Sequence, residues 1–76
     1  MSSIHDPRYQ RLIAKLVEIR ETKNVTQLKL ATSLHKPQSY IAKVENFERR
    51  LDILELCDWV SALDEDIVVF LKNTLY

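Results

Sequence analysis

Apolar residues recur along most of the chain at intervals of three and four positions, which is the spacing of one face of an α-helix. The first such run lies between residues 9 and 20. Pro7 suits the first turn of a helix there, because its missing N–H needs no partner, and Asp6 can cap that turn. The pattern therefore predicts a first helix from Pro7 to about Lys23, ended by Asn24.

Two shorter helical patterns stand close together between residues 26 and 46. Thr26 can cap the first, and Pro37 can open the second because no N–H is needed in a first turn. The connection is too short for a flexible linker, so the two helices must cross at a steep angle, as in a helix-turn-helix. Ala31 is the small residue expected at the crossing. Four aliphatic side chains can fill the wedge between the helices: Leu30, Leu34, Ile41 and Val44.

Acidic residues indicate where two more helices begin. Asp52 and Glu55 form an Asp-x-x-Glu pattern that resembles a capping box and starts a fourth helix. Negative charge at residues 64–66 favours the N-terminus of a fifth helix over about 66–75. No segment combines strand alternation with turn chemistry. The sequence therefore predicts an all-α fold, a compact five-helix domain covering residues 1–76.

The composition excludes several classes of protein. A chain of 76 residues forms one domain at most. Cys57 is the single cysteine, so no internal disulfide forms, and His5 and His35 lie apart without companions that could hold a metal. The longest apolar run, Ile67 to Leu71, is far shorter than the roughly 18 residues of a membrane span, and the N-terminus lacks the apolar core of a signal peptide. We expect a cytoplasmic protein without a cofactor.

Charge is unevenly distributed although the formal net charge is zero. Residues 1–50 carry a net charge of +5, and residues 51–76 carry −5. A molecule polarised in this way can present one face to phosphates and keep the other away from them. A solvated surface of mixed charge is the alternative.

Short motifs occur in register across the chain, and together they resemble one family. They are Thr26-Gln27, Leu30-Ala31, Leu34, Ser39-Tyr40-Ile41 and Glu45-Asn46, with Leu16, Ile19 and Arg20 upstream and the run from Arg49 to Asp52 downstream. At these offsets the chain resembles the lambda-repressor/Cro-type helix-turn-helix family, also called Xre-like. The resemblance covers about residues 12–72. It implies a lambda-repressor-like fold and a DNA-binding transcriptional regulator.

Two positions depart from the family's pattern. The family usually has glycine where His35 and Phe47 stand, and this chain contains no glycine. Histidine can adopt the left-handed backbone that the first glycine allows, because it is enriched at positive φ relative to bulky residues. For Phe47 we expect a different backbone, with the ring packed against the core.

The resemblance assigns the base-reading side chains to the exposed start of the third helix. Gln38 can pair with N6 and N7 of adenine, and Ser39 can contact either base of a pair. Lys43, on the same face, can reach guanine or a phosphate. Tyr40 contacts a phosphate or a thymine methyl, or is instead a core ring. For Gln38 and Lys43, a solvated surface position is the alternative.

Contacts to the DNA backbone are expected on both sides of that helix. Gln27 begins the second helix, where free N–H groups can meet a phosphate. Lys36 lies in the turn. Asn46, Arg49 and Arg50 resemble the family's backbone-contacting loop, although Arg50 could instead cap the acidic fourth helix.

Two further expectations concern structure and assembly. The family often joins the positions of Arg20 and Glu45 by an ion pair between the first and third helices. The fifth helix is apolar on every side, so part of it would be exposed on a monomer, which favours a homodimer over a loosely covered monomer. The expected interface residues are Trp59, Val68, Phe70, Leu71 and Leu75, although Trp59 could instead complete the core.

The sequence therefore predicts a transcriptional regulator, for example a repressor, that binds a palindromic operator in double-stranded DNA as a homodimer. The third helix would enter the major groove. The alternative is an antitoxin-like module whose main partner is another protein, held by the aliphatic and acidic C-terminal third. An enzyme is least expected, since the sequence has no activated nucleophile, metal set or glycine loop for phosphate, and no small-molecule ligand is evident.

Overall fold

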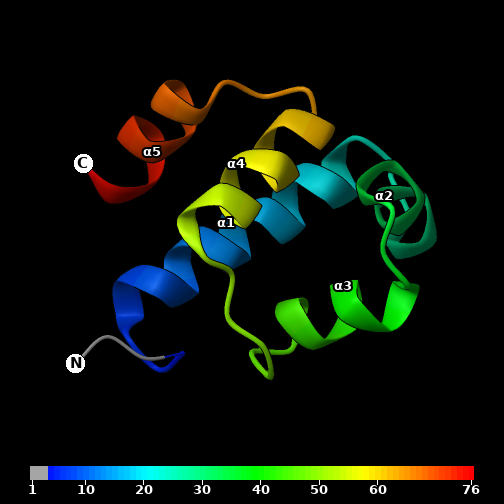
Figure 1. The fold of residues 1–76 in the computed structure, drawn as a ribbon. Helices are drawn as coiled ribbons and strands as arrows, with labels where there is room; N and C mark the ends of the chain where they lie inside the picture. The colour runs from blue at the N-terminus through cyan, green and yellow to red at the C-terminus, as the bar shows by residue number, and fades with distance from the viewer. Residues whose placement is uncertain (1–3) are drawn as a thin grey trace.

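Five helices follow one another in the computed structural model, which describes residues 4–76 (Figure 1). They are α1 (Pro7–Thr22), α2 (Gln27–Leu34), α3 (Gln38–Glu45), α4 (Ile53–Ala62) and α5 (Ile67–Leu75). The prediction of an all-α fold with five helices is confirmed, and no strand occurs from residue 4 onward. Within the same residues, no helix has the length and apolar character that crossing a bilayer requires.

Side-chain caps fix where the helices begin. The Asp6 carboxylate accepts a hydrogen bond from the Arg8 N–H at the start of α1, and Thr26 accepts one from Lys29 at the start of α2. The predicted capping box of α4 is formed in both directions by Asp52 and Glu55. Asp66 caps α5, and α3 begins after Pro37 without a side-chain cap. These polar residues satisfy N–H groups that have no partner within the helix.

Four helices end on a left-handed residue although the chain contains no glycine. These residues follow α1 to α4 in order, and their φ angles are 58° at Asn24, 57° at His35, 61° at Phe47 and 60° at Asp64. At each end, two N–H groups bond back to the last turn in the pattern of a Schellman motif. At the end of α2, for example, the His35 N–H bonds to the Thr32 carbonyl and the Lys36 N–H to the Ala31 carbonyl.

The predicted backbone is confirmed at one of the two positions where glycine was missing. His35 is left-handed as expected. The prediction of another backbone at Phe47 is wrong: its N–H bonds to the Val44 carbonyl at 3.1 Å and the Glu48 N–H bonds to the Lys43 carbonyl at 2.8 Å, which fixes the left-handed geometry. The Phe47 ring is half-buried and packs against the core, as expected.

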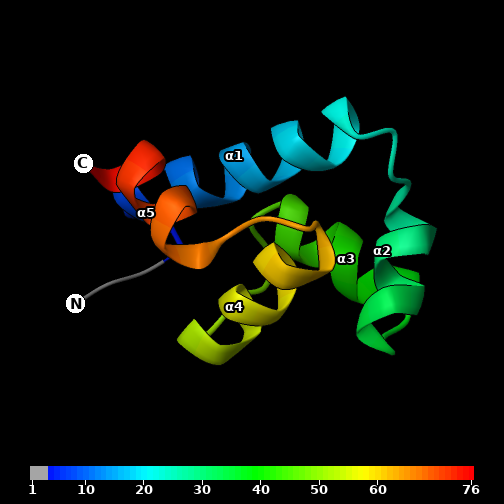
Figure 2. The same ribbon diagram turned by 90° about the horizontal axis from the view of Figure 1, so that it is seen from above.

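The core joins side chains from all five helices. α5 packs beside α1 at one end of the molecule, and α2 and α3 pack together toward the other end (Figures 1 and 2). α4 contacts both α2 and α5. The largest fully buried side chains are Trp59, Ile13, Leu16, Leu30, Ile41, Leu63, Val44 and Val60. This shared core sets the angle at which α3 stands on the rest of the molecule.

Two residues expected at a subunit contact belong to this core instead. Trp59 is 1% exposed and Phe70 is 3% exposed, so neither side chain is available to a second chain. Large aromatic rings bury the most apolar area per residue, so burying Trp59 and Phe70 in the core stabilises the fold. The expectation of an interface role is corrected for both.

Candidate nucleic-acid interface

The predicted crossing of α2 and α3 is present and tightly packed. Ala31 is 1% exposed and Ile41 and Val44 are fully buried, so the two helices approach each other through a small residue and two aliphatic ones. α2 and α3 make the most extensive contact between elements of the chain. The buried side of α3 is thereby fixed against α2, and its other side is left for solvent.

The exposed side of α3 carries three of the residues predicted to read bases. Gln38 and Ser39, at the first two positions of the helix, and Lys43, one turn later, are all exposed. Among residues 4–76 none of their side chains has a hydrogen-bond or ion-pair partner, so their polar groups are available to a ligand. Amide, hydroxyl and ammonium groups on one helix face suit the edges of base pairs in a major groove.

Tyr40, predicted either as a DNA contact or as a core ring, is a core ring. It is 9% exposed and packs edge-on against Trp59, with the ring centroids 6.0 Å apart. The Tyr40 hydroxyl accepts a hydrogen bond from Trp59 Nε1 at 3.1 Å and donates one to Glu55 Oε2 at 3.4 Å. Burial raises the pKa of Tyr40 above its ordinary value. The core role, the second of the two alternatives for Tyr40, is the one present in the structure.

The expected ion pair between Arg20 and Glu45 is present and nearly buried. Arg20 Nε and NH2 donate to the two Glu45 carboxylate oxygens at 2.7 and 3.0 Å, and the two side chains are 10% and 6% exposed. Arg20 NH1 also donates to the Val25 carbonyl at 2.7 Å. Two parallel bonds of this kind fix orientation as well as position. The pair ties the end of α3 to α1.

Gln27 is joined to the same ion pair. Its Nε2 donates to Glu45 Oε1 at 2.8 Å, which draws the first residue of α2 toward the end of α3. The side chain has no other hydrogen-bond partner in the described part of the chain, so one amide hydrogen and the amide oxygen stay available. Gln27 is half-buried, and the predicted phosphate contact stays a prediction.

Cationic side chains flank the start of α3 and the segment that follows it. Lys36 Nζ and Arg49 Cζ lie 5.5 and 4.7 Å from the centroid of the Tyr40 ring, within the range of cation–π interactions. Arg49 is also paired with Glu55 at 3.0 Å. Hydrogen bonding from Arg49 lowers the pKa of Glu55 below its ordinary value, and the same bond raises the pKa of Arg49. Both groups are thus charged at neutral pH.

The remaining predicted backbone contacts are exposed on the same segment. Asn46 forms the C-cap of α3, and its N–H bonds to the Ala42 carbonyl. Arg50 is exposed in the connection to α4. Asn46 is neutral, whereas Arg50 adds to the positive charge that the exposed side chains of Lys36, Lys43 and Arg49 place on α3 and the segments that flank it.

The apolar surface of α5 differs from the predicted interface. Val68 is 60% exposed, whereas Leu71 and Leu75 are half-buried. Sequence reasoning missed several exposed apolar residues: Val69 on α5, Leu28 on α2, and Ile53 and Leu54 on α4. Ile53 and Leu54 are the first two residues of α4, directly after the capping residue Asp52.

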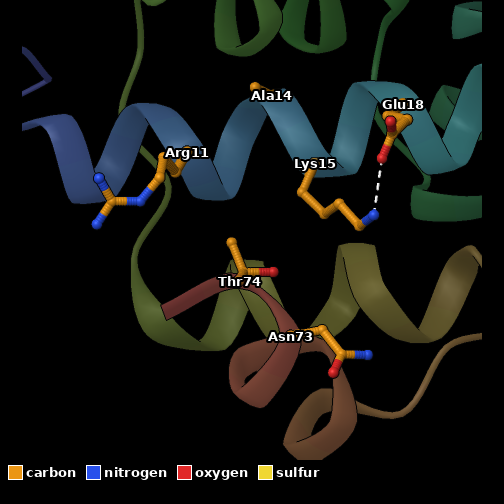
Figure 3. Close-up of a pocket in the computed structure, with 6 residues that line it drawn as sticks. All are labelled: Arg11, Ala14, Lys15, Glu18, Asn73 and Thr74. Atoms are coloured by element: carbon orange, nitrogen blue, oxygen red, sulfur yellow. Dashed lines mark hydrogen bonds and ion pairs between the residues drawn. The ribbon is translucent and has the colours of Figure 1, made fainter. Parts of the chain in front are cut away.

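An open hollow of about 310 Å³ lies between α1 and the end of α5 (Figure 3). Its lining residues are Arg11, Ala14, Lys15, Glu18, Asn73 and Thr74. Lys15 is already paired with Glu18, one turn further along α1, at 2.7 Å. Among residues 4–76, no group of three or more His, Cys, Asp or Glu side chains is arranged to hold a metal ion.

Comparisons with known proteins agree with this geometry. A helix-turn-helix family model matches residues 16–70 of the chain. Among solved structures, the chain is similar to an XRE-family like protein from Pseudomonas syringae pv. tomato str. DC3000, with 41% sequence identity and a TM-score of 0.87. The match covers 93% of this chain and 87% of that one. No curated protein matches the chain.

Proposed function

The chain belongs to the Xre-like helix-turn-helix family, a family of DNA-binding regulators, and we propose that it controls transcription by binding a palindromic operator as a homodimer. Helix α3 enters the major groove, and the two copies read half-sites about one helical turn apart. The observation that carries the proposal is the exposed, uncommitted set of Gln38, Ser39 and Lys43 on a helix whose other side is buried.

The side chains proposed to contact DNA fall into two groups, those that contact base edges and those that contact the DNA backbone. Gln38 is the first candidate to read a base and Lys43 the second, with Ser39 beside them. Lys36, Asn46, Arg49, Arg50 and Gln27 are the candidates for contacts to phosphates. Because phosphate contacts carry no sequence information, the two groups are separable by experiment.

A selection of bound sequences from random duplexes, followed by fluorescence anisotropy, tests the reading helix. Gln38→Ala is expected to weaken binding to the selected duplex by roughly 5- to 150-fold and to relax the preference at one position, which corresponds to about 1–3 kcal/mol for a base contact. Lys43→Ala is expected either to do the same or to weaken all duplexes alike. Matched controls are Asn73→Ala and Lys72→Ala on the exposed surface of α5. If both α3 variants keep the affinity and the sequence preference of the wild type, α3 is not the helix that reads the bases.

The homodimer is supported by exposed apolar residues at the start of α5, where Val68 and Val69 are 60% and 50% exposed. A two-fold contact through this surface would cover side chains that a monomer leaves in water. Val68→Glu is expected to shift the sedimentation of the protein from dimer to monomer and to weaken operator binding. A wild-type chain that sediments as a monomer at micromolar concentration counts against the dimer. Stable co-purification with a different protein, resistant to nuclease and high salt, would instead favour the antitoxin-like alternative.

A further inference from the structure

Glu55 is the meeting point of four hydrogen bonds between α3, α4 and the segment that joins them. Its Oε1 accepts from the Asp52 N–H at 3.0 Å and from Arg49 NH1 at 3.3 Å. Its Oε2 accepts from Arg49 NH2 at 3.0 Å and from the Tyr40 hydroxyl at 3.4 Å. The capping box alone accounts for one of these bonds, so the carboxylate does more than begin α4.

The core holds this carboxylate in place. Tyr40 reaches Glu55 from α3, and its hydroxyl is in turn fixed by Trp59 Nε1 at 3.1 Å. Trp59 is 1% exposed and belongs to the hydrophobic core. A chain of bonds therefore runs from a buried indole, through a phenol, to a carboxylate near the surface. Networks of this kind position their outermost member more tightly than any single bond does.

Arg49 lies at the outer end of this network, and only some of its guanidinium N–H groups are engaged in it. Both terminal nitrogens face Glu55, NH1 also donates to the Arg50 carbonyl at 3.0 Å, and the guanidinium lies over the Tyr40 ring. The Nε–H and the second NH2 hydrogen have no partner in the part of the chain from residue 4 to residue 76. The side chain is 41% exposed. Two parallel donors on one edge of a guanidinium match a phosphate group.

We propose that Glu55 and Tyr40 are positioning residues that hold Arg49 ready, with its Nε and NH2 edge outward, to clamp a DNA backbone phosphate beside α3. The inference rests on the proposed function, since it explains how the protein orients Arg49 for its proposed contact with the DNA backbone. A free arginine loses side-chain freedom when it binds, at about 0.5–1.5 kcal/mol, whereas Arg49 has already lost it on folding. Releasing Arg49 is therefore expected to weaken binding roughly two- to tenfold.

If Glu55 acted only through its negative charge, its removal would strengthen DNA binding. The direction of the change in affinity therefore distinguishes this possibility from the positioning role. Replacing an acid near DNA by its amide removes repulsion from the phosphates and tightens binding. Glu55→Gln keeps a residue type that capping boxes use but loses the charged pair with Arg49. Glu48→Gln is the matched control, because Glu48 is exposed in the same segment and its side chain makes no hydrogen bond or ion pair within residues 4–76.

The experiment measures the affinity of the full chain for its selected duplex by anisotropy over a series of salt concentrations. Glu55→Gln and Tyr40→Phe are expected to weaken binding two- to tenfold, and Glu48→Gln to leave it equal or tighter. Arg49→Gln is expected to lower the slope of log affinity against log salt by about 0.9, the value for one phosphate contact. On the Arg49→Gln background, Glu55→Gln is expected to have no further weakening effect. Far-UV circular dichroism confirms that each variant is folded.

Two results overturn the inference while leaving the proposed function in place. One is a Glu55→Gln variant that binds as tightly as the wild type or more tightly, as is expected of Glu48→Gln. The other is a weakening by Glu55→Gln that persists when Arg49 is already glutamine, because the effect then does not act through Arg49. A wild-type chain that selects no DNA sequence overturns the proposed function, and this inference with it.

Discussion

Replacing the left-handed His35 by glycine is expected to stabilise the protein. A left-handed backbone costs a residue with a Cβ atom roughly 1–2 kcal/mol, and glycine escapes this cost. Glycine also gives the unfolded chain more conformational freedom, which lowers the free energy of unfolding by about 0.4–1 kcal/mol. The imidazole is exposed and makes no hydrogen bond or ion pair within residues 4–76, so no polar interaction is lost with it. The free energy of unfolding should rise by about 0.5–1 kcal/mol, or roughly 2–8 °C in Tm.

Urea denaturation followed by circular dichroism measures this change, with equal m values for the two proteins as the condition for comparing them. His35→Ala is the control, because alanine keeps the Cβ atom and should give no gain. Asn24→Gly and Asp64→Gly should gain less, since the short polar side chains of Asn and Asp can hydrogen-bond locally in the left-handed conformation. An unchanged or lower midpoint for His35→Gly would show that the turn after α2 does not strain the residue in it.

Three other outcomes follow from the contacts. Glu45→Ala leaves the guanidinium of Arg20 buried without its partner, and should lower the free energy of unfolding by about 3–5 kcal/mol in urea denaturation. Hydrogen bonding from a neighbouring arginine lowers the pKa of Asp6 to about 2, from an ordinary value of 3.8. The stabilisation from this carboxylate is therefore present above pH 3.8 and lost as the pH falls through about 2, and Asp6→Asn should remove that acid-side slope in pH-dependent melts. Gln38→Ala and Lys43→Ala should unfold within about 0.5 kcal/mol of the wild type.

The helix starts could be predicted because their signals are local. Asp52 and Glu55 are three residues apart, and the capping box they form needs no other part of the chain. Pro7 and Thr26 mark helix starts for equally local reasons. The ion pair of Arg20 and Glu45 spans 25 residues, and only resemblance to a family gave it. Local chemistry thus predicts elements, and it does not predict the contacts between them.

The errors have a common physical cause. An apolar pattern shows which side chains leave water, but in α5, apolar on every side, it does not show which face meets the core. Phe70 was therefore assigned to a partner chain, although it is 3% exposed in this one. Tyr40 carries a ring and a hydroxyl, so the sequence left two roles open until Trp59 and Glu55 were found around it. The left-handed Phe47 was missed because the end of α3 imposes its geometry through backbone bonds that any residue can make.

Two carboxylates that lie off the reading side of α3 hold the helix at both ends. Glu45, at its last position, is bound by α1 and by the start of α2, and Glu55 binds the first turn through Tyr40. Neither bond involves Gln38 or Lys43, whose side chains are uncommitted within residues 4–76. The orientation of the helix and the chemistry it presents therefore depend on different residues. Substitutions on the exposed side of α3 can therefore change which bases are read without disturbing the bonds that orient the helix. The bonds of Glu45 and Glu55 involve no atom of the side chains that would contact the bases.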